Sequence, residues 1–259
     1  MMAQFDTQRF AGSQRLYGQG LVQRLASLHV MVVGIGGVGS WVVEALARTA
    51  VGKISLMDMD DLCISNTNRQ LPAMLGQYGR PKVEAMRERA LSINPSLEVQ
   101  PIFDFLSPEN IDRYLQPKPD YVIDCIDSIK TKTALVAYCR RHKIPLVCTG
   151  GAGGKTDPTR IRVCDLADSI QDPLAAKLRS KLRKEHGFAK QGKKMGVDLV
   201  TSDQAIIYPQ TDGSVCTTKP QTTSVVRLDC AQGFGASMMV TASFAMAAVS
   251  QMITRLQTR

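Results

Sequence analysis

The length, composition and charge of the chain limit what it can be. Its 259 residues, 44% hydrophobic and 21% charged, suit one large α/β unit or two closely packed lobes, and they exclude a disordered chain or a disulfide-stapled miniprotein. The net charge of +9 is compatible with an anionic partner. The seven cysteines include no C-x-x-C pair, and the start MMAQFDTQRF has no apolar signal core, so we expect a cytoplasmic protein with reduced thiols and no zinc site.

The first predicted unit is a strand, a glycine-rich turn and a helix. The apolar run HVMVV (29–33) is followed directly by GIGGVG, by a helical pattern over 41–50 and by a second strand over 53–60. The alternation continues with helical stretches at 81–93, 107–115 and 128–142 and strand-like runs at 97–102, 121–125, 144–148 and 161–164. This order predicts a Rossmann-like α/β fold with a doubly wound, mostly parallel sheet, whose ligands bind at the carboxyl ends of the strands.

Three regions follow from this pattern. We expect an amino-terminal arm over 1–28, the Rossmann-like nucleotide-binding region over 29–168, and an irregular carboxyl-terminal region over 169–259 that packs on the same domain. The last region holds an uncharged stretch, 230–254, that is long enough to raise the question of a membrane span. Polar residues interrupt it, so a buried helix or a subunit interface is the favoured interpretation, with membrane association as the alternative.

A basic segment opens the carboxyl-terminal region. Between Gln171 and Met195 it has eight basic residues against two acidic ones, which accounts for six of the nine net charges. Such a segment is either a solvated helix face, a mobile loop or a surface for a polyanion. The basic residues are Lys177, Arg179, Lys181, Arg183, Lys184, Lys190, Lys193 and Lys194.

The glycine-rich turn is the first candidate binding element. Gly34, Gly36 and Gly39 follow a strand and open a helix, so backbone N–H groups there can approach phosphate oxygens at the positive end of the helix. Asp58 lies at the end of the second strand, where a carboxylate holds ribose hydroxyls. Up to this point, the pattern would fit a dehydrogenase equally well.

A cluster of polar and charged residues beyond the second strand favours a triphosphate over a nicotinamide cofactor. Arg69 and Lys82 are suited to neutralise charge that builds on the phosphates when pyrophosphate leaves. Asp127, after the strand YVIDCID, is placed to hold Mg²⁺ over the same phosphates. The cluster also contains Asp58, Asp60, Asp61, Asn66, Asn68 and Gln70.

These stretches resemble the ThiF/MoeB/HesA superfamily, the bacterial relatives of ubiquitin-activating enzymes. The resemblance rests on VVGIGGVGSW (32–41), LMDMDDLCISNTNRQ (56–70), GRPKVEAM (79–86), INP (93–95) and VIDCIDS (122–128). It implies an adenylation fold that activates a carboxylate with ATP. Carried over to this chain, it implies that the phosphates are contacted by Gly36, Gly37, Asn66, Arg69 and Lys82, the ribose by Asp58, and Mg²⁺ by Asp127, with Arg15 reaching the triphosphate from the other subunit of a homodimer.

Further motifs narrow the resemblance to one branch of the superfamily. RFAGSQRLYG (9–18), the stretch 149–179 and the stretch 229–244 are similar to enzymes that dehydrate threonylcarbamoyladenosine beside the tRNA anticodon. That resemblance implies activation of the threonyl carboxylate and ring closure by the neighbouring carbamoyl group, so that proximity replaces an enzyme thiol. Cys216 and Cys230 stay as thiol candidates beside the interpretation as buried structural cysteines, and GGAGG (150–154) is either a pocket wall or a plain turn.

We therefore predict an ATP-dependent tRNA-modifying cyclase that acts as a homodimer and binds tRNA through the basic segment as a mobile clamp. A sulfur-relay protein of a cysteine desulfurase is a possible further partner. One alternative is an adenylyltransferase that activates the carboxyl terminus of a sulfur-carrier or ubiquitin-like protein. Another is a non-catalytic tRNA-binding or sulfur-relay scaffold, and a dehydrogenase is a distant third.

Overall fold

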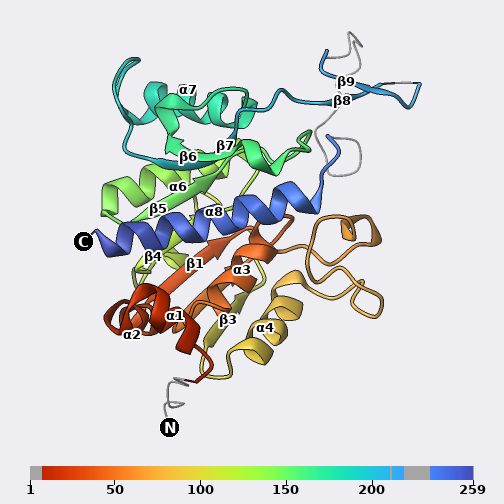
Figure 1. Ribbon diagram of the computed structural model, residues 1–259. Coiled ribbons are helices and arrows are strands. Elements are labelled where there is room, and N and C mark those ends of the chain that lie inside the picture. The colour runs from red at the N-terminus through yellow and green to blue at the C-terminus, as the bar shows by residue number, and fades with distance from the viewer. Residues whose placement is uncertain (1–7, 211, 219–233, 259) are drawn as a thin grey trace.

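The computed structural model describes residues 8–210, 212–218 and 234–258, and a seven-stranded sheet forms its centre (Figure 1). The strand order is β3-β2-β1-β4-β5-β7-β6, and every neighbouring pair is parallel except β6 with β7. The predicted doubly wound, mostly parallel α/β fold is confirmed. The strands are β1 His29–Val33, β2 Lys53–Met57, β3 Glu98–Ile102, β4 Tyr121–Asp124, β5 Leu146–Thr149, β6 Ile161–Asp165 and β7 Asp198–Ser202, with a separate hairpin of β8 Tyr208–Pro209 and β9 Val215–Cys216.

Both faces of the sheet are covered by helices, because the central strands are apolar on both sides. In β1, Val30 and Val32 belong to one core cluster, whereas Met31 and Val33 belong to another. The first face carries α3 Gly39–Ala47, α4 Lys82–Ile93 and α8 Met238–Gln257. The second carries α5 Ile111–Tyr114, α6 Ile129–His142 and α7 Pro173–His186.

The amino-terminal arm contains two short helices that sequence analysis did not predict, α1 Ala11–Tyr17 and α2 Gln19–Ser27. The Gly52 N–H, just before β2, donates to the Leu25 carbonyl, so α2 is held beside the amino ends of β1 and β2. A Cβ at Gly52 would lie 1.9 Å from the Ala26 carbonyl oxygen, which explains glycine at this close approach. The arm is therefore fixed at the amino edge of the sheet.

The prediction of a mobile loop is wrong for the first half of the basic segment, because residues 173–186 form helix α7. The sequence contains its start and stop signals: Asp172 caps the amino end by accepting from the Ala175 N–H, Pro173 occupies the first turn, and Gly187 ends the helix with φ +65°. Leu178 and Leu182 are buried against α6 at helical spacing. Their burial fixes α7 to the sheet.

Helix α8 occupies most of the uncharged stretch and buries one face against α3 and the sheet. Its buried residues recur at helical spacing, among them Val240, Phe244, Ala248 and Met252. In the part of the chain that the structure describes, no helix is long and apolar enough to cross a membrane. The favoured interpretation of a packed helix agrees with this arrangement.

Candidate functional site at the carboxyl edge of the sheet

Three loops meet where the order of the strands reverses. Because β1 lies between β2 and β4, the segments that follow these three strands share one edge of the sheet. Open α/β sheets bind their ligands at such a switch point. The loop between β2 and α4 extends from this edge toward the right of Figure 1.

The glycine-rich turn is packed too tightly for side chains at its two ends. Gly34 has φ +88°, and a Cβ there would lie 3.0 Å from the carbonyl oxygen of Cys125. A Cβ at Gly39 would lie 1.8 Å from the carbonyl oxygen of Gly34. The middle glycines are less crowded: a Cβ at Gly37 would lie 3.3 Å from Arg69 Cγ, and one at Gly36 would lie 3.9 Å from Gln70 Nε2. The turn thus brings bare backbone beside the side chains of the β2–α4 loop.

Asp58 and Lys82 form the charged centre of the site. Asp58 Oδ2 accepts from the Ile35 N–H at 2.7 Å, and Oδ1 accepts from the Asp60 N–H at 2.9 Å. Lys82, buried at the start of α4, donates to Asp60 Oδ2 at 2.6 Å and lies 3.7 Å from Asp58 Oδ1. Burial raises the pKa of Asp58, and the Lys82 ammonium opposes this rise. The pair therefore joins the glycine turn, the end of β2 and α4.

The β2–α4 loop holds Arg69 over the glycine turn. Its backbone carbonyl accepts from Trp41 Nε1 at 3.0 Å and lies 3.5 Å from Thr241 Oγ1, so α3 and α8 fix its position. Its guanidinium donates to the Ser65 carbonyl and to Asn68 Oδ1. These contacts keep the guanidinium within its own loop at the rim of the turn.

The neighbouring amides have structural contacts of their own. Asn66 is buried, and its Oδ1 accepts from the Cys63 N–H at 3.0 Å, which closes the short 3-10 turn Ile64–Asn66. Asn68 Nδ2 donates to the Ala236 carbonyl, so this loop is tied to the segment that leads into α8. Gln70 is also buried, and its Oε1 has no hydrogen-bond partner in the structure.

Asp127 lies exposed in the segment after β4, next to the glycine turn. A fully buried ion pair stabilises the start of that segment: Lys132 Nζ lies 2.9 Å from Asp124 Oδ2. Lys132 also donates to the Ile126 carbonyl, and the Ile126 N–H donates to Asp124 Oδ1. Sequence analysis missed this pair. The sequence feature that points to this ion pair is Asp124 in YVIDCID, followed eight residues later by Lys132 on the next helix.

The GGAGG turn packs against two segments distant in sequence. Asp172 Oδ2 accepts from the Gly151 N–H and from Thr201 Oγ1, and a Cβ at Gly150 would meet the same oxygen at 1.9 Å. The Gly154 N–H donates to the Gly235 carbonyl. Beside the turn lies a groove of about 460 Å³ lined by Ser169, Ile170, Gln171, Asp172, Pro173, Ala176, Arg179, Ala205, Ile206, Tyr208 and Thr217.

Lys155 anchors the base of this region, and sequence analysis missed it as well. It is buried, and its ammonium donates to the carbonyls of Gln171, Ser202 and Gln204. Burial lowers the pKa of Lys155. The only sequence feature that points to this buried lysine is its position directly after the glycine-rich run GGAGG.

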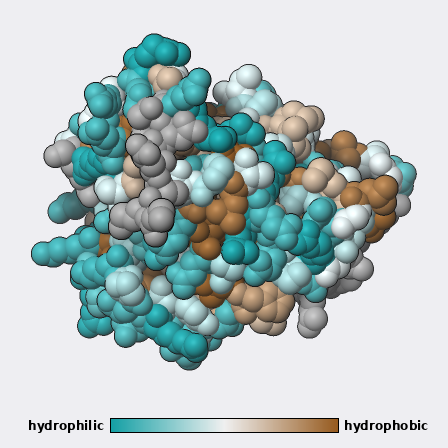
Figure 2. All heavy atoms as spheres, turned by 90° about the horizontal axis from the view of Figure 1, so that it is seen from below, coloured by the Kyte–Doolittle hydropathy of each residue, from teal (hydrophilic) through white to brown (hydrophobic). Residues whose placement is uncertain are grey.

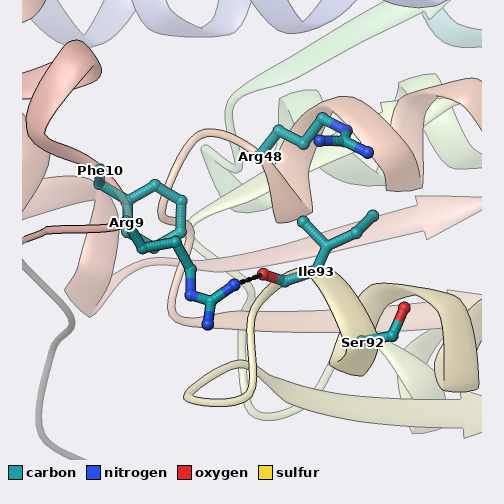
Figure 3. Close-up of a pocket in the computed structure, with 5 residues that line it drawn as sticks. All are labelled: Arg9, Phe10, Arg48, Ser92 and Ile93. Atoms are coloured by element: carbon teal, nitrogen blue, oxygen red, sulfur yellow. Dashed lines mark hydrogen bonds between the residues drawn. The ribbon is translucent and has the colours of Figure 1, made fainter.

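Arg15 is exposed on α1, at the opposite edge of the sheet from the glycine turn. A second hollow, about 320 Å³, lies at that amino edge and is lined by Arg9, Phe10, Arg48, Ser92 and Ile93. Figure 3 shows Arg9 reaching to the Ile93 carbonyl, while Arg48 points away from it. This hollow belongs to the packing of α1 against the ends of α3 and α4. Arg15 therefore lies away from the glycine turn of its own chain.

The eight basic residues of the basic segment fall into two sets. Arg179 donates to the carbonyls of Leu166 and Ser169, and Arg183 donates to the Ala189 carbonyl, so both guanidinia are used within the chain. Lys181 is half-buried beside Glu185 at 3.5 Å. The others are exposed: Lys177, Lys184, Lys190, Lys193 and Lys194.

The two thiol candidates are not equally placed. Cys216 is half-buried in β9, and its Sγ lies 3.3 Å from the Thr218 carbonyl. Cys230 lies outside the described residues. Near the glycine turn, burial raises the pKa of Cys125 to about 12, so that thiol stays protonated at neutral pH.

Comparison with known proteins places the chain in a family. A model of the ThiF family matches residues 10–259. The chain belongs to the ThiF family. It is 53% identical, over 97% of its length and 94% of the relative, to the tRNA threonylcarbamoyladenosine dehydratase of Escherichia coli strain K12. It is 52% identical, over 99% of its length and 97% of the relative, to the enzyme of that name from Haemophilus influenzae.

Solved structures of a ThiF-family protein agree with this placement. The E. coli tRNA N6-threonylcarbamoyladenosine dehydratase TcdA, in complex with ATP, superposes with a TM-score of 0.88 at 48% identity and covers 100% of this chain and 97% of that one. A complex of the same protein with AMP gives a TM-score of 0.87 at 49% identity. The resemblance to the ThiF/MoeB/HesA superfamily is confirmed.

The site has groups that fit the nucleotide predicted from the sequence. A carboxylate offers about four lone-pair positions, and the backbone N–H groups occupy two of those of Asp58, which leaves acceptors for ribose hydroxyls. Gln70 provides a buried acceptor without a partner beside the turn. Across the described residues 8–210, 212–218 and 234–258, no group of three or more His, Cys, Asp or Glu side chains is placed to hold a metal.

Proposed function

We propose that this protein is an ATP-dependent tRNA threonylcarbamoyladenosine dehydratase. It activates the threonyl carboxylate of the modified adenosine beside the anticodon, and the neighbouring carbamoyl group closes a ring with net loss of water. The observation that carries the proposal is similarity over 97% of the chain to the E. coli dehydratase. The convergence of Gly34–Gly39, Asp58, Arg69 and Lys82 at one edge of the sheet supports it.

ATP supplies the energy that makes the carboxylate reactive. Asp58 holds the ribose, and the N–H groups of Gly36 and Gly37 with the start of α3 face the phosphates. Lys82 and Arg69 place positive charge where negative charge grows as pyrophosphate departs. Asn66 fixes the β2–α4 loop, and Asp60 fixes the Lys82 ammonium. Asp127 would hold Mg²⁺, which would neutralise charge on the phosphates.

Ring closure needs no thiolate from the protein. The nucleophile belongs to the substrate, so holding it beside the activated carboxylate is sufficient. Burial raises the pKa of Cys139 to about 12 as well as that of Cys125, and it raises the pKa of Cys148 well above its ordinary value. These thiols are therefore protonated and unreactive at neutral pH. The groove beside the GGAGG turn, with Tyr208 in its wall, lies where the modified adenosine enters.

The proposed assembly is a cytoplasmic homodimer in which Arg15 reaches the triphosphate of the partner subunit. The exposure of Leu16, Ile64 and Leu75, at 74%, 76% and 95%, supports an interface between copies. Figure 2 shows apolar areas near the middle and toward the right-hand end of the face seen from below. A sulfur-relay protein is a further proposed partner, and pull-down with the purified relay protein tests it.

Pyrophosphate release decides between the dehydratase and its main alternative. Purified protein is mixed with ATP and Mg²⁺, and then with either tRNA that carries threonylcarbamoyladenosine or a sulfur-carrier protein with a free carboxyl terminus. We expect release only with the modified tRNA, and mass spectrometry of its nucleosides should show a product lighter by one water. Release that depends on the carrier protein would favour the adenylyltransferase. Binding of tRNA without consumption of ATP would favour the scaffold.

A further inference from the structure

Helix α7 and the loop that follows it carry a row of lysines whose charge is not neutralised. Lys177, Lys184, Lys190, Lys193 and Lys194, here called the lysine strip, are exposed, and within the described part of the chain none of them forms an ion pair. Some surface cations elsewhere are paired, for example Arg80 with Glu88 and Arg255 with Asp198. Lys177 and Lys184 are seven residues apart and so share one face of the helix. Among the described residues, the helix thus carries two lysines without an ion pair on one face, and the loop after it carries three more.

The lysine strip runs from the carboxyl edge of the sheet to the amino edge. At the start of α7, Asp172 accepts from the Gly151 N–H, beside the end of β5. At the other end, Arg140 of α6 donates to the Met195 carbonyl at 2.6 Å, just before β7 begins. Figure 1 shows the loop after α7 on the opposite side of the molecule from the β8–β9 hairpin. Fourteen residues of helix span about 21 Å, so the charges extend well away from the glycine turn.

The backbone beneath the strip is fixed. Arg179 donates to the carbonyls of Leu166 and Ser169, and Leu178 and Leu182 are fully buried. The Met195 and Gly196 N–H groups donate to Asp165, which closes the loop after α7. Only the long lysine side chains are free to adjust to a partner.

The surface around the lysine strip has few of the side chains that bind unpaired bases. Proteins that hold single-stranded RNA stack its bases on exposed aromatic rings. Residues 173–196 contain no Tyr or Trp, the one phenylalanine, Phe188, is buried beneath Arg140, and His186 is the one exposed aromatic ring. Lysines spread along a helix and the loop that follows it are instead suited to the phosphates of a double-helical stem, which is recognised by its backbone and shape.

We propose that the lysine strip docks a double-helical RNA stem whose axis lies along α7. This inference rests on the proposed function, since it places the loop of a stem-loop over the carboxyl edge and its stem toward the amino edge. The inference assigns different roles in RNA binding to two surfaces of the protein. The strand ends and the groove hold the reacting nucleotide, and the strip sets affinity through stem phosphates without reading sequence. Two further exposed cations, Arg141 and Lys143, lie at the end of α6, which packs against α7.

The test compares RNA hairpins that share one loop but have a full or a shortened stem. Binding of unmodified hairpins, followed by fluorescence anisotropy at several salt concentrations, makes the readout independent of catalysis. The variant changes Lys190, Lys193 and Lys194 to Gln. The matched control removes three cations elsewhere by changing Lys53, Arg87 and Arg113 to Gln.

We expect the strip variant to weaken binding of the full-stem hairpin at least tenfold and to reduce the slope of log affinity against log salt by about 0.9 for each phosphate that the variant no longer neutralises. The short-stem hairpin should bind weakly to wild type and variant alike. Equal weakening with both hairpins, equal weakening in the control, or unchanged binding would overturn the inference. So would a single strand of the same length that binds wild type as tightly as the full-stem hairpin. Turnover of modified tRNA by wild type, measured separately, shows whether the proposed function stands.

Discussion

Lys82 illustrates how one residue can serve both the fold and the proposed chemistry. Its ammonium neutralises Asp58 and Asp60 at the carboxyl edge, and the buried start of α4 holds it in place. Burial already raises the pKa of Asp58, so removal of Lys82 would raise it further. The same ammonium has donors left for a phosphate oxygen.

We therefore predict that Lys82→Ala lowers kcat for pyrophosphate release by about 10²- to 10³-fold and changes the KM for ATP by much less. The reason is that the charge on the phosphates grows in the transition state. Steady-state kinetics with modified tRNA measures both constants. Lys53→Ala, which removes a surface lysine paired with Glu98 at the opposite edge, is the control and should retain wild-type rates. An unchanged kcat in Lys82→Ala would remove this residue from the phosphate site.

Asp127 differs from Lys82 because its side chain is exposed. We predict that Asp127→Asn raises the Mg²⁺ concentration needed for half-maximal turnover by about tenfold or more, since an amide oxygen is a weaker ligand for Mg²⁺ than a carboxylate. Thermal unfolding should be unaffected. Asp112→Asn, which changes another surface aspartate, is the comparison. A Mg²⁺ titration that matches wild type would show that Asp127 lies outside the site.

Glu44 links α3 to α4 by accepting from Arg48 and Arg89. Burial alone would raise its pKa, but the hydrogen bonds from the two arginines lower it below the ordinary value of 4.5. A lowered pKa means that the contribution to stability is present above pH 4.5 and is lost as the pH falls through the folded-state value.

Glu44→Gln should accordingly lower the free energy of unfolding by about 1–2 kcal/mol at neutral pH, a value reduced because both arginines are partly exposed. The difference from wild type should shrink as the pH is lowered through the folded-state pKa of Glu44, because the wild-type carboxylate then becomes protonated. Urea unfolding at neutral pH and at a series of acidic pH values measures this. A difference that stays constant with pH would mean that the shape of the Glu44 side chain, rather than its charge, stabilises the contact between α3 and α4.

At the scale of elements, sequence patterns predicted six of the strands and the helices between them, because apolar runs and glycine turns are local signals. They missed β7, which begins at Asp198 directly after the basic segment. Asp198 is tolerated there because it pairs with Arg255 of α8, 2.6 Å away and 57 residues along the chain. The sequence predicted the glycine turn Gly34–Gly39, whose motif is contiguous. It did not predict the buried contacts of Lys155, where distant segments meet.

Helix α7 also shows why composition misled the prediction of a mobile loop. Eight cations drew attention to charge, whereas the buried Leu178 and Leu182 and the inward contacts of Arg179 determine the structure. Charge count alone does not distinguish an anchor from a binding residue.

Arg179→Gln and Lys177→Gln should thus give opposite results. We predict that Arg179→Gln lowers the free energy of unfolding by about 1–3 kcal/mol, because the carbonyls of Leu166 and Ser169 lose a charged donor. The salt dependence of RNA binding should not change. Lys177→Gln should leave stability within about 0.5 kcal/mol and reduce the salt slope. Chemical unfolding and anisotropy titrations measure the two effects, and a reduced slope in Arg179→Gln would contradict its role as an anchor.

At the scale of the whole molecule, the position of Arg15 indicates how two chains would cooperate. It lies on α1 at the amino edge, so it can serve an active site only in another copy. We predict that mixing inactive Arg15→Ala with inactive Lys82→Ala restores about a quarter of wild-type activity, since half of the dimers are mixed and each has one intact site. Activity after subunit exchange, with exchange verified by mass spectrometry, provides the measurement. No recovery would place Arg15 outside the partner's site.

The insertion of β7 between β5 and β6 also affects the order in which the sheet can be completed during synthesis. Residues 161–165 leave the ribosome first, yet they pair only with a strand made more than thirty residues later. Until residue 202 has emerged, the nascent protein has an open edge at β5, with unpaired N–H and carbonyl groups that invite pairing with another chain. Domains fold during translation as their strands become available, so this interval is when the growing chain is most prone to aggregate. The lysines of α7 emerge within the same interval and so add positive charge to the growing chain while that edge is open.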